Sequence, residues 1–174
     1  MFIAHAPFGY VLSVAVKNHI RSTTIPPVLS IGACMLGAIA PDFDLLYLHL
    51  IDQGRTHHHR YFTHWPIVWA LFIFICALAW LGWKRSRLPL TGLLFSIGGF
   101  SHMVLDSLVG DIWWFAPFVD RPFSIAHVPA LYSPWWLNFL LHWSFTVELF
   151  ICAGALWLYR ERSRMRAKHR PPLV

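Results

Sequence analysis

Five apolar runs, separated by short polar segments, dominate the pattern of this chain. The clearest of them extends from Trp65 to Trp83 without a charged residue, and about 20 such residues can cross the hydrocarbon core of a bilayer. The pattern predicts an all-α protein, a polytopic transmembrane helical bundle with about five membrane segments. These segments are Pro7 to Ile20, Pro27 to about Leu50, Trp65 to Trp83, Leu88 to about Leu108, and about Trp136 to Tyr159.

The composition agrees with a membrane protein rather than a soluble one. Only 13% of the 174 residues are charged, whereas soluble domains average about 25%. We expect one membrane-embedded domain over residues 1–174. The net charge of +6 does not indicate nucleic-acid binding, because the basic residues cluster at segment ends, in Lys84 to Arg87 and in Arg160 to Arg170, as the positive-inside rule predicts.

The same two basic clusters predict the orientation in the membrane. If both are cytoplasmic, the N-terminus lies outside and the C-terminus inside, and eleven of the fourteen Lys and Arg residues are cytoplasmic. Most acids and nine of the eleven histidines then fall on the outer side, although neither was used to set the topology. The sequence thus predicts a multi-pass protein whose chemistry lies at the extracytoplasmic face.

The outer loop from about Asp111 to Trp135 is rich in Trp, Phe and Pro. Tryptophan favours the membrane–water interface, so we expect this loop to lie on the outer leaflet. A wall that admits a lipid substrate is the alternative interpretation.

The sequence Pro41-Asp42-Phe43-Asp44 interrupts the second apolar run. Proline ends a helix, so both carboxylates can turn inward from irregular backbone. A polar cap at a helix end would explain one acid, but charged groups near membrane depth are costly and usually functional.

A histidine-rich stretch, His57 to His64, precedes the third segment. Imidazole nitrogens bind zinc and other transition metals. We expect His59 and His64 to be ligands and the preceding two histidines to belong to a surface loop. Arg60 offers a planar cation suited to an anionic substrate group.

The stretch Gly98 to Ser107 carries a further pair, His102 and Asp106, four residues apart. On a helix this spacing turns both side chains to one face, which suits two ligands of one metal or, alternatively, a hydrogen-bonded pair. Small residues before the pair allow close helix packing. His5 falls at the same predicted membrane face, whereas the roles of His142 and Glu148 stay open.

These groups together predict a divalent metal centre, with zinc favoured and room for two ions. No nucleophile elbow, phosphate loop or dinucleotide motif competes with it. We expect Asp44, Arg60 and Asp106 to take part in catalysis. The expected metal ligands are His5, Asp42, Asp44, His59, His64, His102 and Asp106.

At these residues the chain resembles the bacterial and archaeal membrane-bound metal-dependent hydrolases, a YdjM-like family described as LexA-binding and inner-membrane-associated. The resemblance covers about residues 5 to 118 and consists of four motifs in order. They are His5, the P-D-x-D of residues 41–44, the H-R-x-x-T-H of residues 59–64, and the S-H-x-x-x-D of residues 101–106 followed by Gly110 to Pro117. The resemblance implies an inner-membrane location, a metal and a hydrolytic reaction.

We therefore expect a membrane-bound hydrolase in which metal-activated water attacks an ester or phosphoester of a lipid-like substrate at the outer face. A metal-ion transporter is one alternative, and it would place ligands near the bilayer midplane. A non-catalytic membrane protein with a structural metal is another, and metal removal would unfold it.

Overall fold

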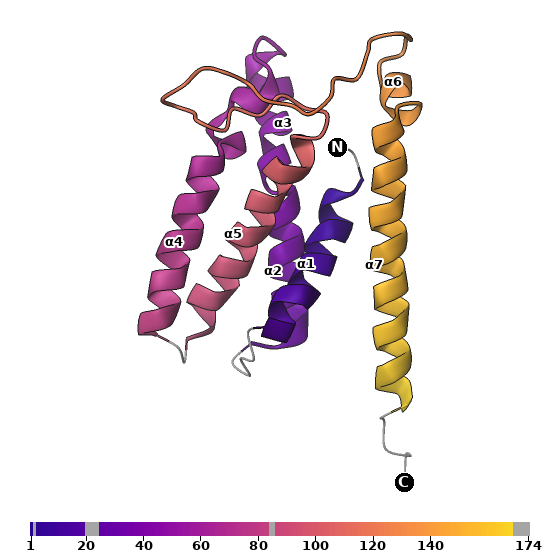
Figure 1. Cartoon of the computed structure of the whole chain (residues 1–174). Helices are drawn as coiled ribbons and strands as arrows, with labels where there is room; N and C mark the ends of the chain where they lie inside the picture. Colours follow the sequence, from indigo (N-terminus) through magenta and orange to yellow (C-terminus); the bar gives the residue numbers. More distant parts are fainter. Residues whose placement is uncertain (2, 20–24, 84–85, 169–174) are drawn as a thin grey trace.

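Helices form close to where the apolar runs predict them. The computed structural model describes residues 1, 3–19, 25–83 and 86–168 (Figure 1). Within these ranges the regular elements are helices and no strand forms, apart from one antiparallel bridge between Ile112 and Phe123. The long helices are α1 (His5–His19), α2 (Pro27–Ile39), α4 (Pro66–Gly82), α5 (Arg87–Asp106) and α7 (Trp143–Lys168).

Short helical turns gather at one end of the bundle, the upper end in Figure 1. Only Ala40 separates Pro41 from α2, and the chain bends by 52° there because proline removes a helical amide donor. The second apolar run is therefore broken rather than continuous. The short elements are η1 (Pro41–Phe43), α3 (Asp44–Tyr47), η2 (Leu48–Asp52), η3 (His58–Arg60), η4 (Phe62–His64) and α6 (Trp136–Leu140).

The last helix differs from the predicted fifth segment at both ends. Residues 136–140 form the separate helix α6, and α7 begins only at Trp143. The helix then continues past Tyr159 through the basic residues to Lys168. Arginine and lysine are good helix formers, so the change to a polar sequence does not end the helix.

Glycines let the backbones of α2 and α5 meet. A Cβ on Gly37 would overlap the carbonyl oxygen of Phe95, and a Cβ on Gly98 would overlap the carbonyl oxygen of Cys34. On the other side of α5, Gly99 accommodates the ring of Trp69 from α4. This close packing of small residues is the arrangement expected from the sequence. It fixes the position of α2 along the axis of α5.

The outer faces of the helices are apolar and exposed. On α4 the exposed side chains include Leu71, Phe74 and Leu78, and on α7 they include Phe150 and Trp157. Among the described helices, α5 is long and apolar enough to cross a membrane, and the bent pair of residues 27–39 and 41–52 adds a second span if it is counted as one. Helix α4 is apolar over 17 residues.

The two ends of the bundle differ in chemistry. Helices α5 and α7 have their basic ends at the lower end in Figure 1, whereas the turns that carry the acids and histidines lie at the upper end. The loop between α5 and α6 runs across this upper end (Figure 1). Lys84, Arg85 and Arg170 from the predicted basic clusters lie outside the described residues.

Candidate metal centre

Four separate stretches of the chain deliver acids and histidines to one point at the upper end of the bundle. They are the start of α1, the η1–α3 turn after α2, the η3–η4 turns before α4, and the last turn of α5. The turns after α2 and before α4 exist because Pro41 and Pro66 interrupt regular helix. All seven predicted metal ligands lie in these stretches.

The first donor group consists of Asp42, His64, His102 and Asp106, whose donor atoms all lie within 4.8 Å of one another. Nε2 of His102 is 3.5 Å from Oδ1 of Asp42 and 3.1 Å from Oδ2 of Asp106. Nε2 of His64 is 3.7 Å from Oδ1 of Asp42. Donors bound about 2.0–2.2 Å from a tetrahedral ion lie about 3.3–3.6 Å apart. The spacing therefore fits four ligands around one cation.

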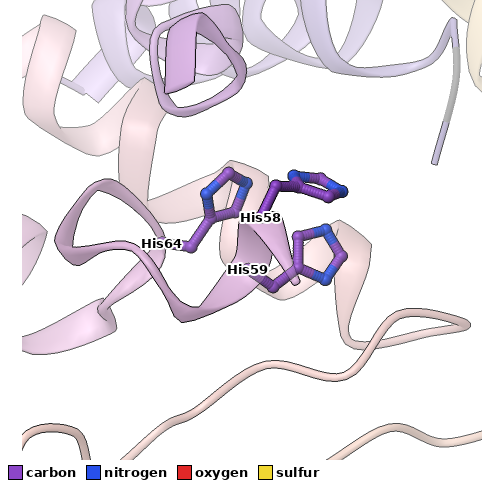
Figure 2. Close-up of side chains that lie close together, drawn as sticks. All are labelled: His58, His59 and His64. Atoms are coloured by element: carbon purple, nitrogen blue, oxygen red, sulfur yellow. The ribbon is translucent and has the colours of Figure 1, made fainter. Parts of the chain in front are cut away.

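A second donor group consists of His58, His59 and His64 and shares His64 with the first. Figure 2 shows the three imidazoles around a common space, with His64 on one side and His58 and His59 on the other. His59 also connects the groups, because its Nε2 is 3.3 Å from Oδ2 of Asp106. The two groups thus form one continuous cluster.

Hydrogen bonds orient three of the rings toward the cluster. Nδ1 of His102 donates to the carbonyl oxygen of Ala38 at 2.8 Å, and Nδ1 of His59 donates to that of Asp111 at 3.0 Å. A carbonyl oxygen only accepts, so both rings carry a proton on Nδ1 and turn Nε2 toward the cluster. Metal-binding histidines are held in this manner.

Asp44, which was predicted as a metal ligand and a catalytic residue, orients the third ring. Its Oδ2 accepts hydrogen bonds from Nδ1 of His64 at 2.6 Å and from Oγ1 of Thr63 at 2.6 Å. His64 then directs Nε2 at the cluster. The first donor group includes Asp42 but not Asp44, and Asp44 contacts that group through His64.

Unpartnered polar atoms concentrate at the cluster. Among the described residues, six buried side-chain nitrogen or oxygen atoms lack a hydrogen-bond partner, and five of these belong to the cluster: Nδ1 of His5, Oδ1 of Asp44, Nδ1 of His58, and Nε2 of His64 and of His102. Buried polar groups are nearly always satisfied. A cation is the partner that imidazole lone pairs and carboxylates share, so the residues present fit a bound metal.

His5 closes the cluster from α1. Its Nε2 is 3.1 Å from Oδ1 of Asp106, and its ring stacks on that of His102 with the centroids 3.8 Å apart. The amino group of Met1 contacts the same carboxylate oxygen. Asp106 is almost fully buried, so positive charge beside it is needed to offset its desolvation.

The protonation of His59 and His64 differs because their surroundings differ. Burial lowers the pKa of His59 to about 4 despite the nearby carboxylate of Asp106, so this ring is neutral at pH 7 and its Nε2 can bind a metal. Burial also acts to lower the pKa of His64, but Asp42 and Asp44 outweigh it and raise the pKa. The two carboxylates thus favour positive charge at His64, carried by a proton or by a metal.

Arg60, which was predicted to bind an anionic substrate group, contacts a loop residue and lies outside both donor groups. Its Nη2 donates to Oδ2 of Asp120 at 2.7 Å, and its guanidinium lies over the ring of Trp113, 5.3 Å from the centroid. Both partners belong to the loop that crosses the upper end of the bundle. Arg60 follows His59 in η3, and this turn directs His59 inward and Arg60 outward, so the guanidinium joins η3 to the loop.

His58 is the cluster residue that the sequence did not identify. Adjacent histidines could not be ranked without the turn η3, which places His58 beside Asp44, with Nδ1 3.8 Å from Oδ1. His58 also lines a cavity of about 430 Å³. The cavity contacts Asp42 and Asp106 on the cluster side and Trp135 and Phe139 on the other, so the cluster is open to a small molecule.

Glu148 has a structural role that its position in the sequence did not reveal. Its Oε2 accepts hydrogen bonds from the backbone amides of Ile3, at 2.6 Å, and Ala4, at 3.2 Å. These amides directly precede α1, where helical donors lack internal partners. Glu148 therefore joins α7 to the segment that carries His5.

We expect the Glu148→Ala variant to lose about 2–4 kcal/mol of stability, because two amides hydrogen-bonded to a buried carboxylate are left unpaired. Glu148→Gln keeps an accepting oxygen and should lose less than half as much. Thermal unfolding and hydrogen exchange of the Ile3 and Ala4 amides measure the effect, with Glu161→Ala on the same helix as the control. Equal damage from the glutamine and alanine variants would contradict the capping role.

Comparison with known proteins identifies the family. The model of the YdjM inner membrane protein family matches residues 1–167. The chain belongs to this family. The protein is also similar to the inner membrane protein YbcI of Escherichia coli (strain K12), with 29% identity over 119 residues, which is 66% of this chain and 63% of the length of that relative. No solved structure matches the chain.

Membership of this family confirms the resemblance inferred from the motifs and makes the protein an inner membrane protein. The exposed apolar faces of α4 and α7 agree with this location, since soluble proteins rarely expose large contiguous apolar patches. The family match itself specifies neither a metal nor a reaction.

Proposed function

We propose that this protein is a membrane-bound metal-dependent hydrolase that cleaves an ester or phosphoester of a lipid-like substrate. The observation that carries the proposal is the convergence of Nε2 of His64 and of His102 with the carboxylates of Asp42 and Asp106, at distances suited to one cation. A divalent cation there, for which zinc is the best candidate, would act as a Lewis acid and lower the pKa of water to about 7.

The residues around the cation site have separable roles. His64 and His102 turn Nε2 toward the cation site. Their hydrogen bonds to Asp44 and to the carbonyl oxygen of Ala38 hold the rings in this orientation. Asp42 lies between both rings and borders the cavity, so it can accept a proton from water there. The second donor group supports a second ion, since His58 and His59 offer further nitrogens beside the shared His64.

The surroundings of the cavity favour an amphipathic substrate. Leu45, Val109, Trp135 and Phe139 line it together with the donor residues. An apolar wall beside a charged cluster suits a molecule with a hydrocarbon part and a hydrolysable polar group. The aromatic loop then provides the entry from the bilayer.

We further propose that the chain crosses the membrane five times, through α1, the broken α2 segment, α4, α5 and α7. The basic ends of α5 and α7 lie opposite the cluster (Figure 1), which supports a cytoplasmic C-terminus and a cluster at the extracytoplasmic face. Cysteine labelling of Gly54→Cys and Arg164→Cys variants in intact cells tests this. We expect a membrane-impermeant reagent to label only Gly54→Cys from outside. Equal labelling of the two variants would overturn the topology.

Metal reconstitution tests the proposed reaction. The purified protein should hydrolyse p-nitrophenyl esters, bis-p-nitrophenyl phosphate or a micellar phospholipid in the presence of Zn²⁺ or Mn²⁺, and lose this activity with a chelator. Asp42→Asn should lower kcat by more than about 100-fold, because a metal ligand and proton acceptor is lost. His49→Ala, an exposed histidine outside the cluster, is the matched control.

Metal uptake into liposomes and unfolding after metal removal, measured on the same protein, separate the alternatives. A transporter would move the metal into sealed liposomes without hydrolysing any of these substrates, whereas a purely structural metal would leave a protein that unfolds when the metal is removed. Glu148, the acid deeper in α7, caps the segment before α1, which favours the hydrolase over a transport path along that helix.

A further inference from the structure

A second groove lies between α1, α2 and α7, away from both donor groups. Its volume is about 640 Å³. Pro7 and Tyr10 of α1, Ile31 and Met35 of α2, and Leu156 of α7 form an apolar wall. At one end the lining changes to Arg162, Ser163 and Arg166. The groove therefore combines a long apolar trough with a basic mouth.

The groove is open because a glycine without a side chain lies in its floor. Gly32 lies in the floor on α2, and a Cβ there would meet nothing within 4 Å. Helix α7 stands beside the bundle (Figure 1) and contacts α1 through the rings of Tyr159 and Tyr10, whose centroids are 6.2 Å apart. These contacts brace α7 without filling the space next to α2.

The basic mouth lacks a matching acid. Arg162 and Arg166 are four residues apart on α7 and so share one face, and their charges also act on Lys17 of α1. In the part of the chain that the structure describes, no carboxylate forms an ion pair with any of these three residues. The nearby Glu161 approaches Arg164 instead, at 4.0 Å. Two arginines at the mouth, with a lysine near enough to feel their charge, favour an anion there.

We propose that this groove binds one anionic phospholipid, with its phosphate at Arg162 and Arg166 and an acyl chain along Tyr10, Ile31 and Leu156. Basic pockets between membrane helices bind lipid head groups in this way. A free anion would leave the apolar trough empty. A second copy of the chain in the same orientation would bring the same positive charges to this end, which disfavours a homodimer here.

Lipid binding by the purified full-length protein tests the proposal. Dioleoylphosphatidylglycerol is the probe, and zwitterionic dioleoylphosphatidylcholine is the reference lipid. Native mass spectrometry counts bound lipid, and thermal unfolding measures its stabilising effect. We expect about one retained phosphatidylglycerol per chain and binding about tenfold weaker for the Arg162→Ala/Arg166→Ala variant, because two head-group contacts are lost.

A variant of the trough gives an independent measurement. Gly32→Leu places a side chain in the groove where open space exists, so it should block the lipid without disturbing the fold. Gly154→Leu on α7 also meets nothing within 4 Å and lies outside the groove, and Arg164→Ala removes a neighbouring cation that does not line it. Both controls should bind phosphatidylglycerol as the wild type does.

Three results would overturn the proposal: equal retention of phosphatidylcholine, unchanged binding in the double arginine variant, or a lipid-free dimer that Gly32→Leu dissociates. The proposal does not depend on hydrolysis. Metal content should be the same in the groove variants and the wild type, so failure of either proposal can be recognised separately.

Discussion

Purified His102→Asn protein is expected to contain almost no divalent metal, whereas the wild type retains about one ion or more per chain. The asparagine amide can still donate to the carbonyl oxygen of Ala38, as Nδ1 of His102 does at 2.8 Å, but it has no counterpart of Nε2. A four-donor set reduced to three should bind its ion more than about 100-fold less tightly, since even outer-shell changes cost about 10–100-fold.

Metal analysis by mass spectrometry and calorimetric titration of the metal-free protein measure this effect. His127→Ala is the matched control, because His127 lines the cavity but is exposed and belongs to neither donor group. The metal affinity of Asp44→Ala should lie between those of His102→Asn and His127→Ala, reduced about 10–100-fold from the wild type. The reason is that Asp44 orients His64 without belonging to the four-donor set. If the His102→Asn variant bound the metal with wild-type affinity, the proposed metal centre would be excluded.

The sequence predicted most of the residues that lie together in this cluster. His102 and Asp106 were predictable because a spacing of four on a regular helix fixes a common face. His59, His64 and Asp42 followed from their density beside proline breaks. The positive-inside rule then placed all of these groups at one end, and the fold brings them together there.

The positions of Asp44, His58 and Arg60 depend on short turns, which have no apolar periodicity that a sequence pattern could reveal. One 3₁₀ turn, η3, contains both His58 and Arg60, and it brings the former to the cluster and the latter to Asp120 of the loop. No periodicity decides which of several neighbouring polar residues faces inward in such a turn. The partners of Arg60 also lie more than fifty residues further along the chain, so the sequence alone could not reveal them.

Helix boundaries, too, were predictable only in part. The long apolar helices appear where the pattern predicts them, because burial or lipid exposure imposes hydrophobicity along their whole length. The break before Trp143 and the continuation of α7 to Lys168 were not predicted. The change from apolar to basic residues in α7 shows where the apolar environment ends. It does not show where the helix ends, because arginine and lysine are good helix formers.

The close contact between α2 and α5 leads to the second large effect, in Gly98→Ala. A single added methyl group would overlap the carbonyl oxygen of Cys34 and approach the backbone nitrogen of Ala38 at 2.8 Å. Both obstacles are backbone atoms of α2, so relief requires the helices to move apart. Overpacking of this kind costs about 1–3 kcal/mol or more, and the shift would also separate His102 from the carbonyl oxygen of Ala38 that orients it.

We therefore expect Gly98→Ala to lose both thermal stability and metal affinity, although residue 98 contacts no metal. Gly154→Ala provides the comparison, because a Cβ at that glycine meets nothing within 4 Å and alanine favours the helix. Unfolding in detergent and metal titration of the folded fraction report the two effects. If Gly98→Ala unfolded at the wild-type temperature and bound metal with wild-type affinity, the packing of α2 against α5 could not be what aligns the donor groups.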